Sequence, residues 1–172
     1  MYAIRCTKKL LDRGAPMPLA PESSPTTLLG DWYANIVIAK PMHVVVCVSE
    51  RTLLPVLVTA KDIKSLPARL ADAAKEMLRS IGVPKEDIDA ECIEMNVSYF
   101  AKTSSRKILG SLNDFVFHFQ HGVGSHSDQN LHERALRMAR MPCSVLDFSY
   151  PSEATVAAFA TSKAIRAAAG AA

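Results

Sequence analysis

The residues best suited to chemistry lie in one polar run, Lys102–Asp114. Its first half gathers cations and hydroxyl groups from Lys102, Thr103, Ser104 and Arg106. At the start of a helix, free backbone N–H groups together with such side chains suit an anion such as phosphate or a carboxylate. In the alternative, structural interpretation, one hydroxyl caps the helix and the arginine pairs with an internal carboxylate.

A second candidate cluster lies earlier in the chain, where Asp31, Trp32 and Tyr33 open an apolar run. Successive strand residues point to opposite faces of a sheet, so one aromatic ring faces each side. An aromatic ring would supply stacking area, Arg106 a positive charge and Asn113 directed hydrogen bonds. The candidate ligand-binding residues are therefore Asp31, Trp32, Tyr33, Lys102, Thr103, Ser104, Arg106, Asn113 and Asp114.

Three functions fit these residues. The first, which we favour, is a non-enzymatic binding or interaction module for an anionic or polar partner. The second is a hydrolase- or transferase-type enzyme in which Asp31 or Asp114 acts as a base and Arg106 stabilises negative charge. The third is a purely structural role for the polar motifs. A closed, fully paired network would favour the structural role, and an open cleft would favour a site.

Histidines follow the polar run at His118, His121, His126 and His132, together with Asp128. His118 and His121 lie one helical turn apart, a spacing that zinc sites use. No cysteine joins them, and the next residues belong to a Gly/Ser-rich loop. We therefore expect surface histidines at a helix end, with no metal and no other cofactor.

The four cysteines are far apart in the sequence and form no CxxC motif. Cys6 and Cys47 lie in apolar, strand-like runs, where cysteine behaves as a small hydrophobic residue. We expect free buried thiols and no disulfide, as in a reducing cytoplasm. Cys143 follows Pro142, but no sequence motif supplies it with a base, so we do not expect a nucleophile.

Composition limits the class of protein. The chain has 172 residues, 49% hydrophobic and 22% charged, which is ordinary for a single globular domain over residues 1–172. Its net charge of +3 is well below that of a dedicated nucleic-acid binder. Apolar runs such as Val44–Val48 are too short to span a membrane, and Arg5 and Lys8 interrupt any signal peptide. We expect a cytoplasmic protein.

The polar run enters a helix expected near residues 104–121. The apolar stripe of this helix follows the helical period and comprises Ile108, Leu109, Leu112, Phe115, Val116 and Phe119. Arg106, Gly110, Asn113 and Phe117 share the opposite side. Phe117 beside a glycine indicates that a second element packs there. That element is another helix of this chain, a second subunit in a homodimer, or a ligand.

The remaining elements are shorter. Strands are expected near 2–6, 32–38, 43–49, 56–58 and 97–101, and helices near 7–11, 66–81, 84–95, 131–141 and 153–168. The segment near 15–27 contains four prolines and is expected to be a loop. The early hairpin and the later helices predict an α+β fold, with a small, mostly antiparallel sheet packed on one face by several helices.

Several segments together resemble an uncharacterised bacterial family, carried as a domain of unknown function. They are Arg5–Leu11, Leu29–Asn35, Glu50–Val56, Lys102–Phe115 and Met141–Ser144. The most specific pieces are the LGDWYAN run and the R-x-x-LGS-x-ND run. Ser105 stands where the family usually has Asn, and Lys107 where it usually has Ser. The resemblance implies a cytosolic bacterial protein and supplies no activity.

Overall fold

The computed structural model describes residues 1–14, 24–38, 42–121 and 130–170. Its strands are β1 (Tyr2–Cys6), β2 (Trp32–Val37), β3 (Val44–Ser49), β4 (Pro55–Thr59) and β5 (Ser98–Lys102). Its described α-helices are α1 (Lys8–Leu11), α2 (Leu66–Ser80), α3 (Lys85–Glu94), α4 (Arg106–His121), α5 (Leu131–Met138) and α6 (Pro151–Gly170). The predicted α+β class is confirmed. Residues 15–23 of the expected proline-rich loop lie outside the described residues.

The five strands form one mixed sheet in the order β4-β3-β2-β1-β5. The pairings of β3 with β2 and β4 are antiparallel, so the predicted hairpin is confirmed. β1 runs parallel to both of its neighbours, β2 and β5. Parallel neighbours need long connections. Along the chain, α1 lies between β1 and β2, and the strands β2, β3 and β4 come between β1 and β5.

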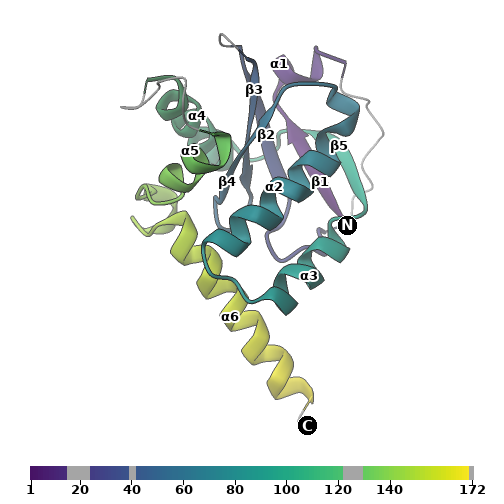
Figure 1. The fold of residues 1–172 in the computed structure, drawn as a ribbon, viewed down its shortest axis with the longest axis vertical. Coiled ribbons are helices and arrows are strands. Elements are labelled where there is room, and N and C mark those ends of the chain that lie inside the picture. Colours follow the sequence, from purple (N-terminus) through teal and green to yellow (C-terminus); the bar gives the residue numbers. More distant parts are fainter. Residues whose placement is uncertain (15–23, 39–41, 122–129, 171–172) are drawn as a thin grey trace.

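Helices cover both faces of this sheet. Every residue of β3 is buried, although successive residues point to opposite faces. On one face, the Tyr33 hydroxyl group reaches the start of α4. Cys47 pairs with Ala34 and so points the other way, to the face on which Arg69 of α2 lies near it. Figure 1 shows α2 crossing in front of the sheet, so the expected packing on one face is wrong.

The apolar stripe of α4 packs as predicted. Ile108, Leu112, Phe115 and Phe119 are buried, and the remaining two members are partly buried against the same core. Each fully buried side chain of this size contributes roughly 1.5–3 kcal/mol relative to an exposed one. This burial fixes the rotation of α4, so the opposite side of the helix is directed away from the sheet.

Helix α6 is anchored at its beginning and projects from the body of the molecule (Figure 1). Thr155 and Phe159 are buried, and the Thr155 hydroxyl oxygen lies 2.8 Å from that of Thr52. From Ala160 onward the described side chains are exposed, apart from the half-buried Ser162.

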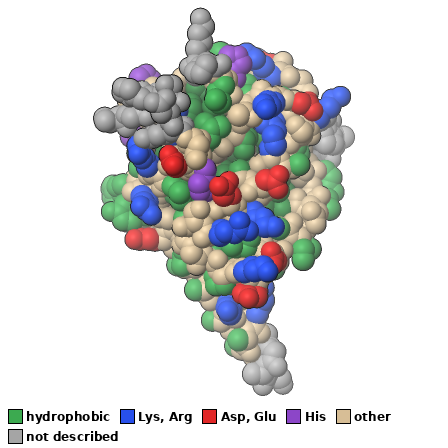
Figure 2. Space-filling view, in the orientation of Figure 1, with side chains coloured by type: hydrophobic (Ala, Val, Ile, Leu, Met, Phe, Trp, Pro, Cys, Tyr) green, Lys and Arg blue, Asp and Glu red, His purple; other side chains and the backbone are tan. Residues whose placement is uncertain are grey.

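The molecular surface is mixed in charge. Figure 2 shows Lys and Arg side chains interspersed with Asp and Glu over the described part of the face that α2 crosses. Within the described ranges, no helix combines the length and the apolar character that crossing a bilayer requires.

Candidate functional site

Asp31, a candidate base and ligand residue, is committed to a structural network. Its side chain is 3% exposed and accepts hydrogen bonds from the Ala3 backbone N–H, at 2.8 Å, and from Arg5 Nε, at 2.6 Å. Removing one partner of such a buried pair typically costs about 3–5 kcal/mol. The arginine that pairs with Asp31 is therefore Arg5, and not Arg106.

Gly30 explains why a glycine precedes this aspartate. Its φ of +78° lies in the left-handed region, and a Cβ atom there would approach Arg51 Cγ and Glu50 Oε2 to 3.1 Å. The Asp31 carbonyl oxygen also accepts a hydrogen bond from the Glu50 N–H at 2.7 Å. A side chain at position 30 would thus disturb a tight contact between two turns.

Trp32 and Tyr33 are both fully buried, so neither ring presents a stacking surface to a ligand. The Tyr33 hydroxyl oxygen lies 2.9 Å from Ser104 Oγ and accepts the Ser105 N–H at 3.1 Å. The two most specific sequence motifs therefore meet at the start of α4. Their contact satisfies backbone and hydroxyl groups within the fold.

The cations at the start of α4 remain open to solvent. Lys102, Arg106 and Lys107 are exposed, and the Arg106 side chain forms no hydrogen bond or ion pair within the described part of the chain. The helix cap is supplied by Ser105, whose Oγ accepts the Ile108 N–H at 3.4 Å. Thr103 is half-buried beside it. The charge of Arg106 is thus not used inside the fold.

We call Arg106, Gly110, Asn113 and Phe117 the open face of α4. All four are exposed, and Phe117 retains 59% of its accessible surface. A Cβ atom built on Gly110 would meet no described atom within 4 Å. The expectation that another helix of this chain packs there is therefore wrong for the described residues.

Asp114 lies on the flank of α4, beside the open face. It is exposed and lines a pocket together with Cys143 and Phe148. Arg106 lies eight residues earlier, about 12 Å along the helix axis at the usual rise. The candidate acids and the candidate arginine are therefore dispersed over the fold: Asp31 directly precedes β2, Arg106 lies at the start of α4 and Asp114 lines the flanking pocket.

A family model matches most of the chain. The model described as Domain of unknown function (DUF6933) matches residues 3–154. The chain belongs to this family. The match confirms the resemblance to an uncharacterised family, and it runs from β1 into the first turn of α6. No match to this DUF6933 chain was found among curated proteins or among solved structures.

The histidines of this DUF6933 domain lie apart. The Phe117 ring stacks on His121 with a centroid distance of 4.6 Å and meets His118 edge-on at 6.0 Å. The His132 ring nitrogen lies 2.9 Å from Ser80 Oγ, on α2. The described ranges contain no cluster of three or more metal-ligating side chains. His126 and Asp128 lie outside the described residues.

The cysteines of the DUF6933 chain are free, as predicted. Burial raises the pKa of the Cys6 thiol to about 12 and raises the pKa of Cys47 as well. The pKa of the half-buried Cys143 thiol is also raised, first by burial and then by the Asp114 carboxylate. A raised pKa keeps each of these thiols protonated at neutral pH, which disfavours nucleophilic chemistry.

Two parts of these arrangements were missed in the sequence. Arg5 was not among the predicted site residues, although a charge inside the apolar run Tyr2–Cys6 is itself an indication of a buried partner. Phe148, on the rim of the flanking pocket, carried no such indication. Its position depends on a backbone conformation that residue type alone does not predict.

Proposed function

We propose that this domain is a non-enzymatic interaction module whose contact surface is the open face of α4, and that its partner is a second copy of the chain. The observation that carries the proposal is the combination on one helix face of an unpaired Arg106, an uncovered Gly110 and an exposed Phe117. In the described part of the chain, Arg106 has no hydrogen bond or ion pair, no neighbour covers Gly110, and Phe117 lies outside the core.

The open face and the adjoining Asp114 are together self-complementary in charge. Arg106, Gly110 and Asp114 are spaced four residues apart and form one ridge along α4. Ridges of this type from two helices commonly pack alongside each other at a crossing angle of about −50°. In a two-fold antiparallel pair that crosses at Gly110, Arg106 of one copy lies opposite Asp114 of the other. The anionic partner of the arginine is then a carboxylate of the second copy.

Gly110 supports the same arrangement. Glycine in an exposed helix interior costs about 1 kcal/mol relative to alanine, and no described neighbour requires a glycine at this position. A second helix would gain from it, because the missing side chain allows the two backbones to approach closely. The exposed Phe117 ring adds apolar area to the same contact.

The enzyme hypothesis has less support. The Asp31 carboxylate is engaged by Arg5 and Ala3, and Asp114 is separated from Arg106 by two helical turns. The Asp31 network favours a structural role for that motif, but it does not involve the open face.

Sedimentation equilibrium of the native chain and the Gly110→Leu variant tests the proposal. We expect the native chain to dimerise reversibly and Gly110→Leu to weaken dimerisation at least tenfold, because leucine keeps the helices apart. In the monomer, the same variant should have a free energy of unfolding about 0.5–1 kcal/mol higher than that of the native chain, because leucine is a better helix former than glycine.

Two further variants serve as controls. Ala68→Leu adds the same side chain to an exposed position of α2 and should leave dimerisation unchanged. Arg106→Glu should weaken the dimer, and the added Asp114→Arg change should restore it. A native chain that stays monomeric at all concentrations, or a dimer that is insensitive to Gly110→Leu, would refute the proposal. Inorganic phosphate that binds Arg106 in a monomer would instead identify a small anion as the partner.

A further inference from the structure

We infer that the pocket beside α4 binds a small organic cation with an apolar body, such as a compact primary amine, through Asp114 and Phe148. We call it the flank pocket. It lies next to the open face and not on it, so the inference concerns a second binding site that goes beyond the proposed self-association.

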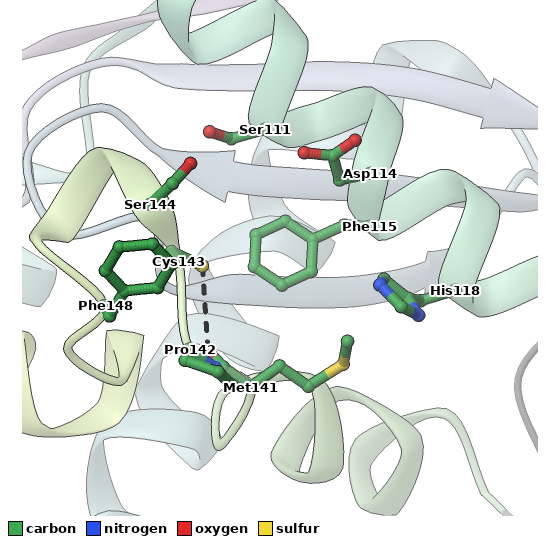
Figure 3. A pocket seen from close by; sticks show the side chains of 9 residues that line it. All are labelled: Ser111, Asp114, Phe115, His118, Met141, Pro142, Cys143, Ser144 and Phe148. Atoms are coloured by element: carbon green, nitrogen blue, oxygen red, sulfur yellow. Dashed lines mark hydrogen bonds between the residues drawn. The ribbon is translucent and has the colours of Figure 1, made fainter.

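The flank pocket lies between α4 and the segment 141–148 and has a volume of about 210 Å³ (Figure 3). Ser111, Asp114 and Phe115 line it from α4, and the Phe115 ring, only 3% exposed, points into its centre. Cys143 and Phe148 line it from the facing segment. The pocket thus combines an apolar interior with polar groups at its edge, which is the usual composition of a small-molecule site.

The rim of the flank pocket is held in an unusual backbone conformation. Asp147 and Phe148 have φ angles of +51° and +63°, and neither is glycine. Such residues are strained and persist only where the surrounding structure fixes them. Here the Phe148 N–H donates to the Cys143 carbonyl oxygen at 3.0 Å, and the Cys143 N–H donates to the Ser149 carbonyl oxygen at 3.2 Å.

This closed segment keeps the Phe148 ring at the surface. The side chain is 73% exposed, the largest fraction among the large hydrophobic side chains of the described residues. An aromatic ring held exposed on the rim of a pocket by a strained, internally bonded turn is preorganised for contact with a ligand. Its face also attracts cations.

Asp114 sets the charge that the flank pocket prefers. It is the one carboxylate among the lining residues, which also include the imidazole of His118 but no lysine or arginine. Asp114 has no hydrogen bond or ion pair within the described part of the chain, and it lies close enough to Cys143 to contribute, after burial, to the raised pKa of that thiol. A cation would therefore be favoured there, and an anion repelled.

The hydroxyl groups of Ser111 and Ser144 lie on the same rim and can accept further N–H groups from an ammonium ion. The volume favours a small ligand, because sites for drug-sized molecules usually enclose about 300–1,000 Å³. A single aromatic ring that carries one aminomethyl group matches both the size and the polarity of the flank pocket.

The test uses benzylamine as the probe, with benzyl alcohol as its neutral analogue and benzoate as the anion of similar shape. We expect saturable benzylamine binding, followed by protein NMR titration, with the largest shift changes at residues 111–118 and 143–148. Benzyl alcohol should bind at least tenfold more weakly, and benzoate should show no saturable binding. Equal affinity for benzylamine and benzyl alcohol would overturn the inference.

Variants locate the binding. Asp114→Asn should weaken benzylamine binding at least tenfold, and Phe148→Ala should weaken it several-fold. Asp89→Asn, a change of equal charge at an exposed position of α3, should have no effect. Both target side chains are exposed, so their variants should keep the native melting temperature. Unchanged affinity in Asp114→Asn would refute the inference.

Asp114 takes part both in the proposed dimer and in the proposed amine site. An experiment must therefore distinguish failure of the dimer from failure of the amine site. We expect the Gly110→Leu variant, which is designed to be monomeric, to bind benzylamine at least as tightly as the native chain, because Asp114 is then not paired with Arg106 of a second copy. If that variant dimerises normally but binds benzylamine, self-association through α4 fails and the flank pocket stands. If it is monomeric and no longer binds benzylamine, the flank pocket as described here is wrong.

Discussion

Buried carboxylates in this domain stabilise backbone turns. Asp31 accepts the Ala3 N–H, and Glu91, which is 4% exposed, accepts the N–H groups of Leu28 at 2.7 Å and Leu29 at 3.0 Å. In the sequence, Asp31 was predicted to bind a ligand. Residue type cannot separate the two roles, because a carboxylate that accepts backbone N–H groups and one that accepts a ligand have the same chemistry. Burial decides between them, and burial depends on distant parts of the chain.

Glu91 makes the stability of the domain depend on pH. Its burial raises its pKa above the ordinary value of 4.5, although the two N–H donors and Arg51 oppose the shift. Because the folded state favours the protonated form, this contribution to stability is fully present below about pH 4.5 and is lost as the pH rises through the raised pKa. Urea denaturation between pH 4 and 8 should show this loss in the native chain and not in Glu91→Gln.

The control for this measurement is Glu86→Gln, an exposed glutamate of the same helix. It should retain the native dependence on pH. If native and Glu91→Gln chains gave parallel pH profiles, Glu91 would not be the titrating group.

At the scale of elements, local patterns predicted most helices and strands correctly. The 3.6-residue period placed α4 and its buried side, because that period is a property of neighbouring residues. The coverage of both sheet faces was missed, although the continuous apolar run Val44–Val48 is typical of a strand that is buried on both sides. The side of α4 opposite its buried stripe was predicted to meet a second element, and no described part of the chain covers it.

The contact of Tyr33 with α4 joins two elements and can be measured. Tyr33→Phe removes the hydroxyl group that accepts the Ser105 N–H and meets Ser104. We expect a loss of about 1 kcal/mol in the free energy of unfolding, the usual contribution of one net hydrogen bond. Faster amide exchange at Ser105 should accompany it. Tyr150→Phe, at an exposed tyrosine, should change neither quantity.

At the scale of the whole molecule, the sheet order could not be predicted. The pairing of β1 with β5 joins Tyr2 to Ser98, and no local pattern links residues so far apart. The short turns between β2, β3 and β4 indicated antiparallel pairing, and extending that pattern to the whole sheet led to the expectation of a mostly antiparallel arrangement. Most residue pairs of the sheet are antiparallel, and the two parallel pairings of β1 are the part that local patterns did not predict.

The projecting part of α6 should contribute little to the stability of the folded chain. Truncation after Ser162 removes mainly exposed residues, so we expect the free energy of unfolding to change by less than about 0.5 kcal/mol. Phe159→Ala, in contrast, should cost about 3–5 kcal/mol because Phe159 is 2% exposed. Chemical denaturation measures both. A loss of several kcal/mol on truncation would mean that the outer half packs against another molecule.

The place of β1 in the sheet also has a consequence for the order of events during synthesis. β1 lies between β2 and β5, yet its register partner Ser98 is made 96 residues after Tyr2. At ribosomal rates of about 5–20 residues per second, this strand waits roughly 5–20 seconds for its second neighbour. During that interval one edge of β1 exposes unpaired backbone groups, which are a template for pairing with other chains. β1 is thus synthesised early but gains its second neighbouring strand late, so the nascent chain is most prone to pair with other chains before β5 is synthesised.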